Sequence, residues 1–449
     1  MVCGRGFRCG SRHCLFGRTA LDVGSRGFAA MMDGTARMSS RRMSGGLERA
    51  RAVTPDRDRL EAFMLDEEPG RIAEDDFRCL LMSSVLSGAS DMTIQSDMQP
   101  RVEIHGVNYR ATRKPWSPSE VDQVLIEVYG GANARTEING RRVLDFSYEL
   151  HLANGRRQRF RVNATGIHGR DGQGVEISLR ALPSATPELE EVQLNPALLG
   201  ALCPPNGIVI IAGATGSGKS TTLAAITRSH LENLGRPVKI IDIQAPIEFT
   251  FRDVTSGFEG SSSMIGQSEV GRHLASFSDG VRSALRRKPN IIIVGEARDF
   301  ATISASLEAA LTGHLVYTTT HASDVSDTIR RLLSTFPAAE REARAFDLVS
   351  GLRFCMVQHL VPRHDGTGRV PVREWLQFTP RVKENLLNLD VNDWPGELVR
   401  EMTVPRTLDA NGMCQSLTQA VDPLLREGVI SREDAVRLCG PAFVQQGAS

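Results

Sequence analysis

The stretch Gly213-Ala-Thr-Gly-Ser-Gly-Lys-Ser220 has the spacing GxxxxGK[ST]. An apolar run at residues 208–212 precedes it, and a helix-like segment that begins at Thr221 follows it. Glycines in such a loop allow consecutive backbone N–H groups to turn toward a phosphate, and the helix N-terminus adds its positive dipole end. The order of strand, glycine loop and helix therefore predicts a phosphate-binding loop, against the alternative of a glycine-rich turn that binds nothing.

The loop offers both phosphate donors and a metal ligand. Lys219 can reach the β- and γ-phosphates, and the Ser220 hydroxyl can ligate Mg²⁺. We therefore predict ATP and Mg²⁺ as the ligands of this stretch. The residues expected to bind the nucleotide are Gly213, Ala214, Thr215, Gly216, Ser217, Gly218, Lys219, Ser220 and Thr221.

Around the loop, strand-like runs alternate with helix-like segments. Four short runs are continuously apolar or β-branched, which is typical of a parallel sheet that is covered on both faces. These runs are residues 208–212, 238–243, 291–294 and 315–319. Residues 274–287 and 300–311 have the apolar spacing of amphipathic helices. The fold class predicted for this region is therefore α/β.

The run at residues 291–294 ends in Gly295 and Glu296. A carboxylate at the carboxyl end of a parallel strand lies beside the phosphate loop, which follows the carboxyl end of another strand. There it can orient water for attack on the γ-phosphate, or hold Mg²⁺ through a water molecule. We predict Glu296 as a catalytic carboxylate, against the alternative of a solvated glutamate at a strand end.

Composition and periodicity divide the 449 residues into five segments. Residues 1–53 are rich in Arg, Gly and Ser, which predicts a disordered extension or a start codon assigned too early, with a transit peptide or nucleic-acid arm as alternatives. Residues 54–183 are predicted to form a small N-terminal α/β domain, followed by a linker at residues 184–190. Residues 191–390 are predicted to form the nucleotide domain, and residues 391–449 a helical C-terminal region.

Local signals place several elements in the outer segments. Residues 73–88 have helical spacing, and Ser117 with Glu120 has the pattern of a capping box before another helix. Alternating apolar residues predict strands in the small domain at residues 92–96, 101–105, 107–111, 143–151, 157–165 and 175–180. A strand pair at residues 358–362 and 369–375, and two short helices at residues 417–438, are predicted beyond the nucleotide domain.

The composition argues against some classes of protein. The formal net charge is +0, which gives no support for a protein that holds nucleic acid through its overall charge. No apolar run approaches the length of a transmembrane helix. The 8 cysteines form no CxxC pair, so neither a zinc site nor a disulfide framework is indicated, and a reducing compartment fits.

Several further stretches, in order along the chain, resemble motifs of the secretion ATPase superfamily, the hexameric motors of type II secretion, type IV pili and type IV secretion. Residues 240–249 (IIDIQAPIEF) resemble its acidic Asp box, and residues 291–299 (IIIVGEARD) its Walker B element. Residues 312–321 (TGHLVYTTTH) resemble its His box. Residues 88–91 and 159–163 resemble the amino-terminal domain of pilus-retraction members.

The resemblance implies a RecA-like P-loop NTPase domain with a smaller PAS-like N-terminal domain and a helical C-terminal region. Glu296 would be the catalytic carboxylate, and Glu248 a second acid near the metal or the attacking water. His314 and His321 would sense the γ-phosphate and transmit its loss. The arginines that could supply charge across a subunit boundary are Arg159, Arg161 and Arg180.

Departures from the family pattern narrow the choice among the branches of the superfamily. Gln244 and Ala245 stand where the Asp box carries adjacent acids, which leaves Asp242 and Glu248. No tetracysteine insertion follows the His box, which disfavours type II secretion and pilus extension. Residues 379–387 match only part of the Ala-Ile-Arg-Asn-Leu-Ile sequence of retraction motors. The nearest resemblance is therefore to the ATPases of Dot/Icm-type type IVB secretion and conjugal transfer.

This resemblance implies an ATP-hydrolysing homo-hexamer in the bacterial cytoplasm, attached peripherally to the inner membrane through components of a secretion or transfer apparatus. No direct sequence-specific binding of nucleic acid is expected. The implied function is to power type IVB-like secretion or conjugal DNA transfer, with pilus retraction as the alternative in the same enzyme class. Two further candidate functions are those of a RecA-like DNA translocase and of a nucleotide-binding scaffold without turnover.

Overall fold

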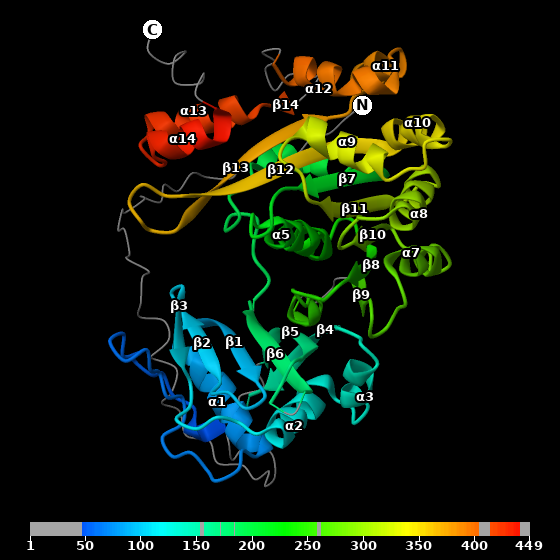
Figure 1. Ribbon diagram of the computed structural model, residues 1–449. Helices are drawn as coiled ribbons and strands as arrows, with labels where there is room; N and C mark the ends of the chain where they lie inside the picture. Colours follow the sequence, from blue (N-terminus) through cyan, green and yellow to red (C-terminus); the bar gives the residue numbers. More distant parts are fainter. Residues whose placement is uncertain are drawn as a thin grey trace, which may run out of the picture. The chain divides into compact units, whose positions relative to one another are not determined.

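The computed structural model describes residues 47–152, 157–170, 172–183, 185–257, 262–403 and 414–440. Most of the predicted extension at residues 1–53 lies outside these ranges. The described residues form two β-sheets, each with its own helices and its own hydrophobic core (Figure 1). This mixed architecture confirms the predicted α/β class.

The first sheet is antiparallel, and its strand order is β3-β2-β1-β6-β5-β4. Its strands are β1 (Ala89–Gln95), β2 (Arg101–Ile104), β3 (Val107–Arg110), β4 (Leu144–His151), β5 (Arg157–Ile167) and β6 (Gly174–Leu182). Alternate residues of β4 are buried, as expected for a sheet with one covered face. The predicted strands all form, with ends that differ by a few residues.

Three α-helices belong to the first sheet: α1 (Glu74–Leu86), α2 (Pro118–Tyr129) and α3 (Ala134–Asn139). A short 3-10 helix, η1 (Leu47–Arg49), precedes them. The predicted capping box is present at α2, where the backbone N–H of Ser117 donates to the Glu120 carboxylate at 2.8 Å. Side chains of α1, α2 and the sheet form one continuous core.

The second sheet has eight strands in the order β14-β13-β12-β7-β11-β10-β8-β9. They are β7 (Gly207–Ala212), β8 (Lys239–Gln244), β9 (Met264–Glu269), β10 (Ile291–Val294), β11 (Leu315–Thr320), β12 (Leu352–Pro362), β13 (Arg369–Gln377) and β14 (Cys414–Gln415). The six strands from β12 to β9 are parallel, and β13 and β14 are antiparallel additions. The four predicted buried runs are β7, β8, β10 and β11, at the centre of this sheet.

Helices cover both faces of the parallel strands. Helix α5 (Lys219–Glu232) packs on one face, and Figure 1 shows α7 (Phe277–Leu285), α8 (Phe300–Leu311) and α10 (Arg341–Gly351) on the other. Helix α9 (Val325–Ser334) joins the second group. The shorter helices near this sheet are η2 (Pro196–Leu198), α4 (Leu199–Leu202) and α6 (Arg252–Gly257).

Two details differ from the sequence expectation. Helix α7 begins at Phe277 rather than at residue 274, because the Ser276 side chain caps it by accepting from the Asp279 N–H. Strand β9 was not predicted, because its sequence Met-Ile-Gly-Gln-Ser-Glu has no regular apolar alternation. It forms as an edge strand through pairing with β8.

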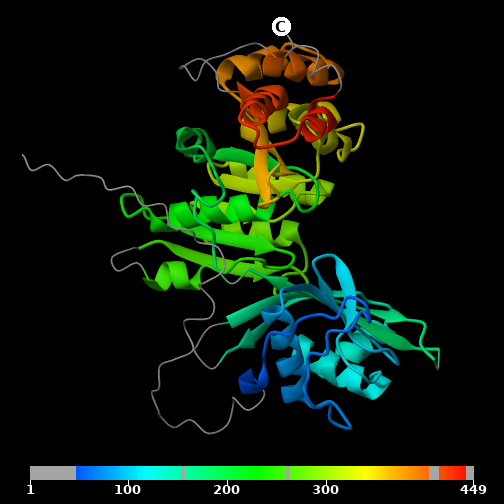
Figure 2. The same ribbon diagram turned by 90° about the vertical axis from the view of Figure 1, so that its left-hand side faces the viewer.

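The C-terminal helices pack in two places. Helices α11 (Pro380–Leu387) and α12 (Trp394–Thr403), the second preceded by η3 (Val391–Asp393), extend the core of the parallel sheet. Helices α13 (Leu417–Arg426) and α14 (Arg432–Cys439), drawn in red in Figure 2, pack on the β12–β13 hairpin around a separate small core. In the part of the chain that is described, no helix is both long and apolar enough to cross a membrane.

Candidate active site

The glycine loop connects β7 to α5 at the carboxyl edge of the parallel sheet. Strand β7 ends at Ala212, and α5 begins at Lys219 after a left-handed Gly218. The Lys219 ammonium donates hydrogen bonds to the carbonyls of Gly213 and Ala214, both at 2.8 Å. Burial lowers the pKa of Lys219, and the negative charges of Glu296 and Glu248 act in the opposite direction. The loop therefore holds a desolvated cation where a phosphate could reach it.

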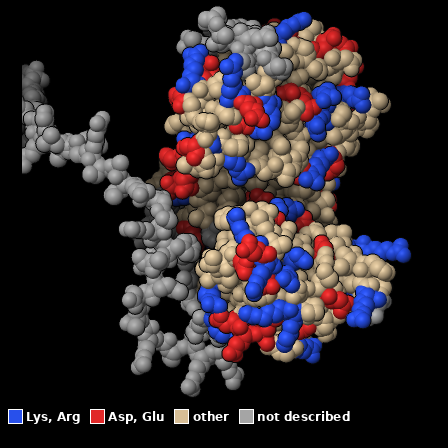
Figure 3. All heavy atoms as spheres, turned by 60° about the vertical axis from the view of Figure 1, so that its left-hand side comes forward, with Lys and Arg blue, Asp and Glu red and all other residues tan. Residues whose placement is uncertain are grey.

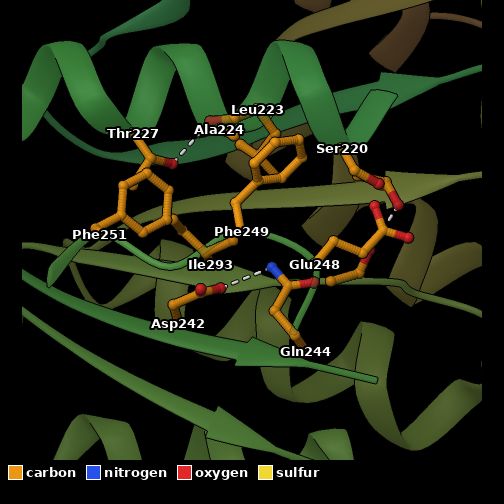
Figure 4. Close-up of a pocket in the computed structure, with 12 residues that line it drawn as sticks. Ser220, Leu223, Ala224, Thr227, Asp242, Gln244, Glu248, Phe249, Phe251 and Ile293 are labelled. Atoms are coloured by element: carbon orange, nitrogen blue, oxygen red, sulfur yellow. Dashed lines mark hydrogen bonds between the residues drawn. The ribbon is translucent and has the colours of Figure 1, made fainter. Parts of the chain in front are cut away.

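A crevice lies beside the loop, between α5 and the ends of β8, β10 and β11. Figure 4 shows Ser220 and Glu248 at the same end of this crevice, with the rings of Phe249 and Phe251 further along it. The rest of the lining comes from Leu223, Ala224, Thr227, Asp242, Gln244, Ile293, Gly295 and Thr319. A hydroxyl and a carboxylate therefore meet next to the loop lysine.

This donor set fits Mg²⁺. No group of three or more His, Cys, Asp or Glu side chains that could hold a metal occurs among the described residues. Mg²⁺ in nucleotide sites takes one or two protein oxygens, several waters and phosphate oxygens, so it needs no such group. Ser220 could be a direct ligand, and Glu248 could bind through water.

Glu296 and His321 lie together at the same edge. They follow β10 and β11, which are parallel neighbours. Nε2 of His321 is 3.2 Å from Oε1 of Glu296, and Arg298 also contacts this carboxylate. Burial, together with the charge of Lys219, lowers the pKa of His321, so the imidazole is neutral near pH 7. A neutral ring can donate from Nε2 to Glu296 and orient it.

His314 lies far from these residues. It precedes β11, and its carbonyl accepts from the N–H of Gly207, the first residue of β7. The six residues of β11 separate it from the loop edge by roughly 20 Å, at about 3.3 Å per residue. Its Nδ1 is 3.1 Å from the carbonyl of Ala309. The structure therefore does not bring His314 to the site, because a parallel strand carries its two ends to opposite edges.

The arginines of the first sheet have different environments. Arg161 is half-exposed and pairs with Asp145 at 2.7 Å. This hydrogen bond is the largest cause that raises the pKa of Arg161, and the charges of Glu248 and Glu296 add to it. Arg180 is exposed and pairs with Asp91. Arg161 is thus within electrostatic reach of the candidate acids of its own chain.

Arg159 is buried, and its guanidinium is used within the chain. It donates to the backbone carbonyls of Ile247 and Glu248, at 2.6 and 2.8 Å. These bonds tie β5 to the segment that carries the Glu248 side chain. Arg159 is therefore committed to positioning that segment, and its expected contribution across a subunit boundary does not agree with this geometry.

Comparisons with known proteins identify the family of this chain. The family model described as "Type II/IV secretion system protein" matches residues 119–397. The chain belongs to the type II/IV secretion system protein family. A twitching motility protein of Neisseria gonorrhoeae is 35% identical over 338 residues, which are 75% of this chain and 83% of that protein.

Two solved structures extend the comparison. The ATPase DotB of Legionella pneumophila aligns with a TM-score of 0.73 and 37% identity, over 85% of this chain and 98% of that one. The pilus retraction motor PilT with bound ADP aligns with a TM-score of 0.67 and 28% identity, over 82% of this chain and 98% of that one. The protein is therefore an ATPase of this family with a RecA-like nucleotide domain, and it uses nucleotide. The comparisons give no support to a scaffold without turnover.

The Asp box of this ATPase has an arrangement that the sequence did not indicate. Asp242 is fully buried in β8, and its two carboxylate oxygens accept from the side-chain amides of Gln244 and Gln267, at 2.7 and 2.8 Å. Gln267 lies on β9, directly opposite Asp242. Asp242 is thus enclosed by amides, which leaves Glu248 as the carboxylate of the box that faces the crevice beside Ser220.

Burial raises the pKa of Asp242 to about 6, from an ordinary value of 3.8. The folded state therefore binds this proton more tightly than the unfolded state does. The contribution of this proton to the free energy of unfolding is fully present below about pH 4, and it is lost as the pH rises through about 6. Asp242→Asn removes the charge and nearly keeps the shape, but its Nδ2 cannot accept, so one of the two glutamine amides loses its acceptor. That cost does not vary with pH, so the pH-dependent part of the difference reports the carboxyl group. We expect it to gain stability relative to the wild type between about pH 4 and about pH 7, by at most about 3 kcal/mol.

Urea unfolding of both proteins across this pH range would measure the effect. Asp253→Asn, on the exposed side of α6, is the matched control and should follow the wild type at every pH. Parallel stability curves for the wild type and Asp242→Asn would show that the carboxyl group titrates normally.

Proposed function

We propose that this ATPase binds MgATP at residues 213–221 and assembles as a hexameric motor that powers type IVB-like secretion or conjugal DNA transfer. The chemistry rests on one observation: Lys219, Glu248 and Glu296 converge at one edge of the parallel sheet. The choice of system rests on the likeness to DotB over nearly the whole of that chain.

Each group has a proposed task. The loop amides and Lys219 bind the β- and γ-phosphates. Ser220 and, through water, Glu248 hold Mg²⁺, which when bound neutralises charge on the phosphates. Glu296 orients the attacking water and can also hold Mg²⁺ through a water molecule, and His321 holds the Glu296 carboxylate through the 3.2 Å contact. Water attacks in line with the β–γ bond, and the products are ADP and phosphate.

Motion would be passed on through the segment that carries Glu248. On its first-sheet side, Arg159 grips the carbonyls of residues 247 and 248. Nearby, the backbone and hydroxyl of Ser147 in β4 donate to Glu269 at the end of β9. Glu269 also accepts from the N–H of Ile247 at 3.1 Å. A displacement of Glu248 on hydrolysis would therefore be transmitted to β4 and β5 through these hydrogen bonds.

The hexamer is proposed from family resemblance. Arg161 is half-exposed and acts electrostatically on Glu248 and Glu296 of its own chain, and the supply of charge across the ring by Arg161 or Arg180 is proposed from the same resemblance. Light scattering of the purified protein with and without a non-hydrolysable ATP analogue tests the assembly. A mass of six chains supports the ring, and a monomer at micromolar concentration with the analogue contradicts it.

The proposed location is the bacterial cytoplasm, with peripheral attachment to the inner membrane through partner proteins.

A DNA translocase receives no support from the charge distribution, because Figure 3 shows basic and acidic side chains interspersed over the visible face. DNA-stimulated hydrolysis would be the evidence for that alternative.

Pilus retraction is the second candidate, favoured by the 35% identity to a twitching motility protein. A strain that lacks the gene separates the two systems. We expect loss of conjugation or effector export, with twitching intact. The reverse pattern would assign the protein to retraction.

A further inference from the structure

Gln358 on β12 lies directly under the nucleotide loop. The register of β12 against β7 pairs Val357 with Ala212, so Gln358 is level with the first residue of the loop. A methyl group on Gly218 would lie only 2.9 Å from Nε2 of Gln358, and one on Gly213 only 2.3 Å from its carbonyl oxygen. Both glycines also have positive φ. The loop therefore packs closely against Gln358 at both Gly213 and Gly218.

The Gln358 side chain makes polar contacts with the loop and with the start of α5. Its Nε2 donates to the carbonyl of Ser217 at 2.7 Å, and its Oε1 accepts from the Thr222 hydroxyl at 2.9 Å. The side chain is only 2% exposed. An amide, with one donor and one acceptor end, satisfies both partners at once.

Arg373 on β13 is the cross-strand partner of Gln358. Its Nε donates to Oε1 of Gln358 at 2.8 Å, and its two terminal nitrogens donate to the carbonyls of Val192 and Gln193. No carboxylate pairs with it among the described residues, and burial lowers its pKa to about 10. A buried guanidinium without a counter-ion is costly, so its fixed fork of donors points to a role in holding these groups.

We propose that Gln358 and Arg373 are positioning residues that hold the nucleotide loop and join it to residues 192–193, where the chain enters the parallel sheet. The chain of contacts runs from Ser217 and Thr222 through Gln358 and Arg373 to the backbone at residues 192–193. This inference rests on the proposed nucleotide site. It adds that occupancy of the loop is transmitted to the entering segment.

Gln358→Glu tests the first step. The carboxylate keeps the size of the side chain and its acceptor for Arg373, but it cannot donate to the Ser217 carbonyl, which it then repels. We expect the KM for ATP to rise about tenfold, because the loop loses its hydrogen bond from Gln358 to the Ser217 carbonyl and one such bond is worth about that factor. The kcat should stay within a few-fold, because Glu296 and His321 lie on other strands, and Tm should be preserved.

Gln377→Glu is the matched control. It makes the same change on β13, four residues after Arg373. Arg373→Lys is the second variant, because it keeps the charge without the planar fork. It too should raise the KM. An unchanged KM in a folded Gln358→Glu or Arg373→Lys protein overturns the inference.

Hydrogen exchange of the amides at residues 190–195, with and without ADP, tests the second step. The wild type should show ADP-dependent protection, and Arg373→Lys should lose it even at saturating ADP. Equal ADP-dependent protection in both proteins overturns the link to the entering segment. A wild type that binds no ADP at all would instead overturn the proposed nucleotide site itself.

Discussion

Replacement of Glu296 by glutamine should abolish ATP hydrolysis while nucleotide binding persists. The amide keeps the shape of the side chain and can still accept from His321, but it carries no negative charge to orient and polarise water. A general base or water-orienting carboxylate contributes roughly 10²- to 10⁴-fold to the rate, so we expect a fall in kcat of that order. Phosphate release measured beside fluorescent ATP binding would separate the two effects.

Glu308→Gln provides the control for this change. It makes the same substitution on the exposed side of α8, so both hydrolysis and binding should remain at the wild-type level. If Glu296→Gln released phosphate as fast as the wild type, another group would have to activate the water, and Glu248 would be the first to test.

Lys219→Met should remove most of the nucleotide affinity. The methionine preserves the apolar stem but removes the ammonium, and a charge-assisted hydrogen bond to phosphate is worth about 1.5–3 kcal/mol. The dissociation constant for ATP should therefore rise roughly 10- to 100-fold. The methionine also leaves the carbonyls of Gly213 and Ala214 without their donor, so Tm is measured alongside the affinity to show that the variant is folded.

Isothermal titration with ATP and Mg²⁺ measures this affinity directly. Lys288→Met, in the exposed turn before β10, is the matched control and should bind as the wild type does. Wild-type affinity in the folded Lys219→Met protein would mean that the loop does not bind phosphate through its lysine.

The sequence pattern predicted the central elements because their formation depends on residues that are close together in the chain. Glycine spacing sets the loop, and β-branched runs favour buried strands wherever they occur. Thus β7, β8, β10 and β11, helix α8 and the capping box at Ser117 were all predicted from neighbouring residues. The edge strand β9 was missed, because its pairing with β8 forms it despite an irregular pattern.

Strand order decided which distant residues meet. His314 and His321 flank one strand in the sequence, yet only His321 reaches Glu296, because all of β11 separates them. Asp242 is enclosed by Gln267 because β9 pairs beside β8.

The sequence by itself determined the α/β class, the loop and the position of Glu296 at the end of a buried strand. The tertiary structure alone decided that Arg159 holds the backbone at residues 247–248, and that Gln358 and Arg373 lie beneath the loop. These contacts join residues that are some 90 to 180 positions apart in the chain and that meet only through tertiary packing, and short-range spacing carries no information about such pairings.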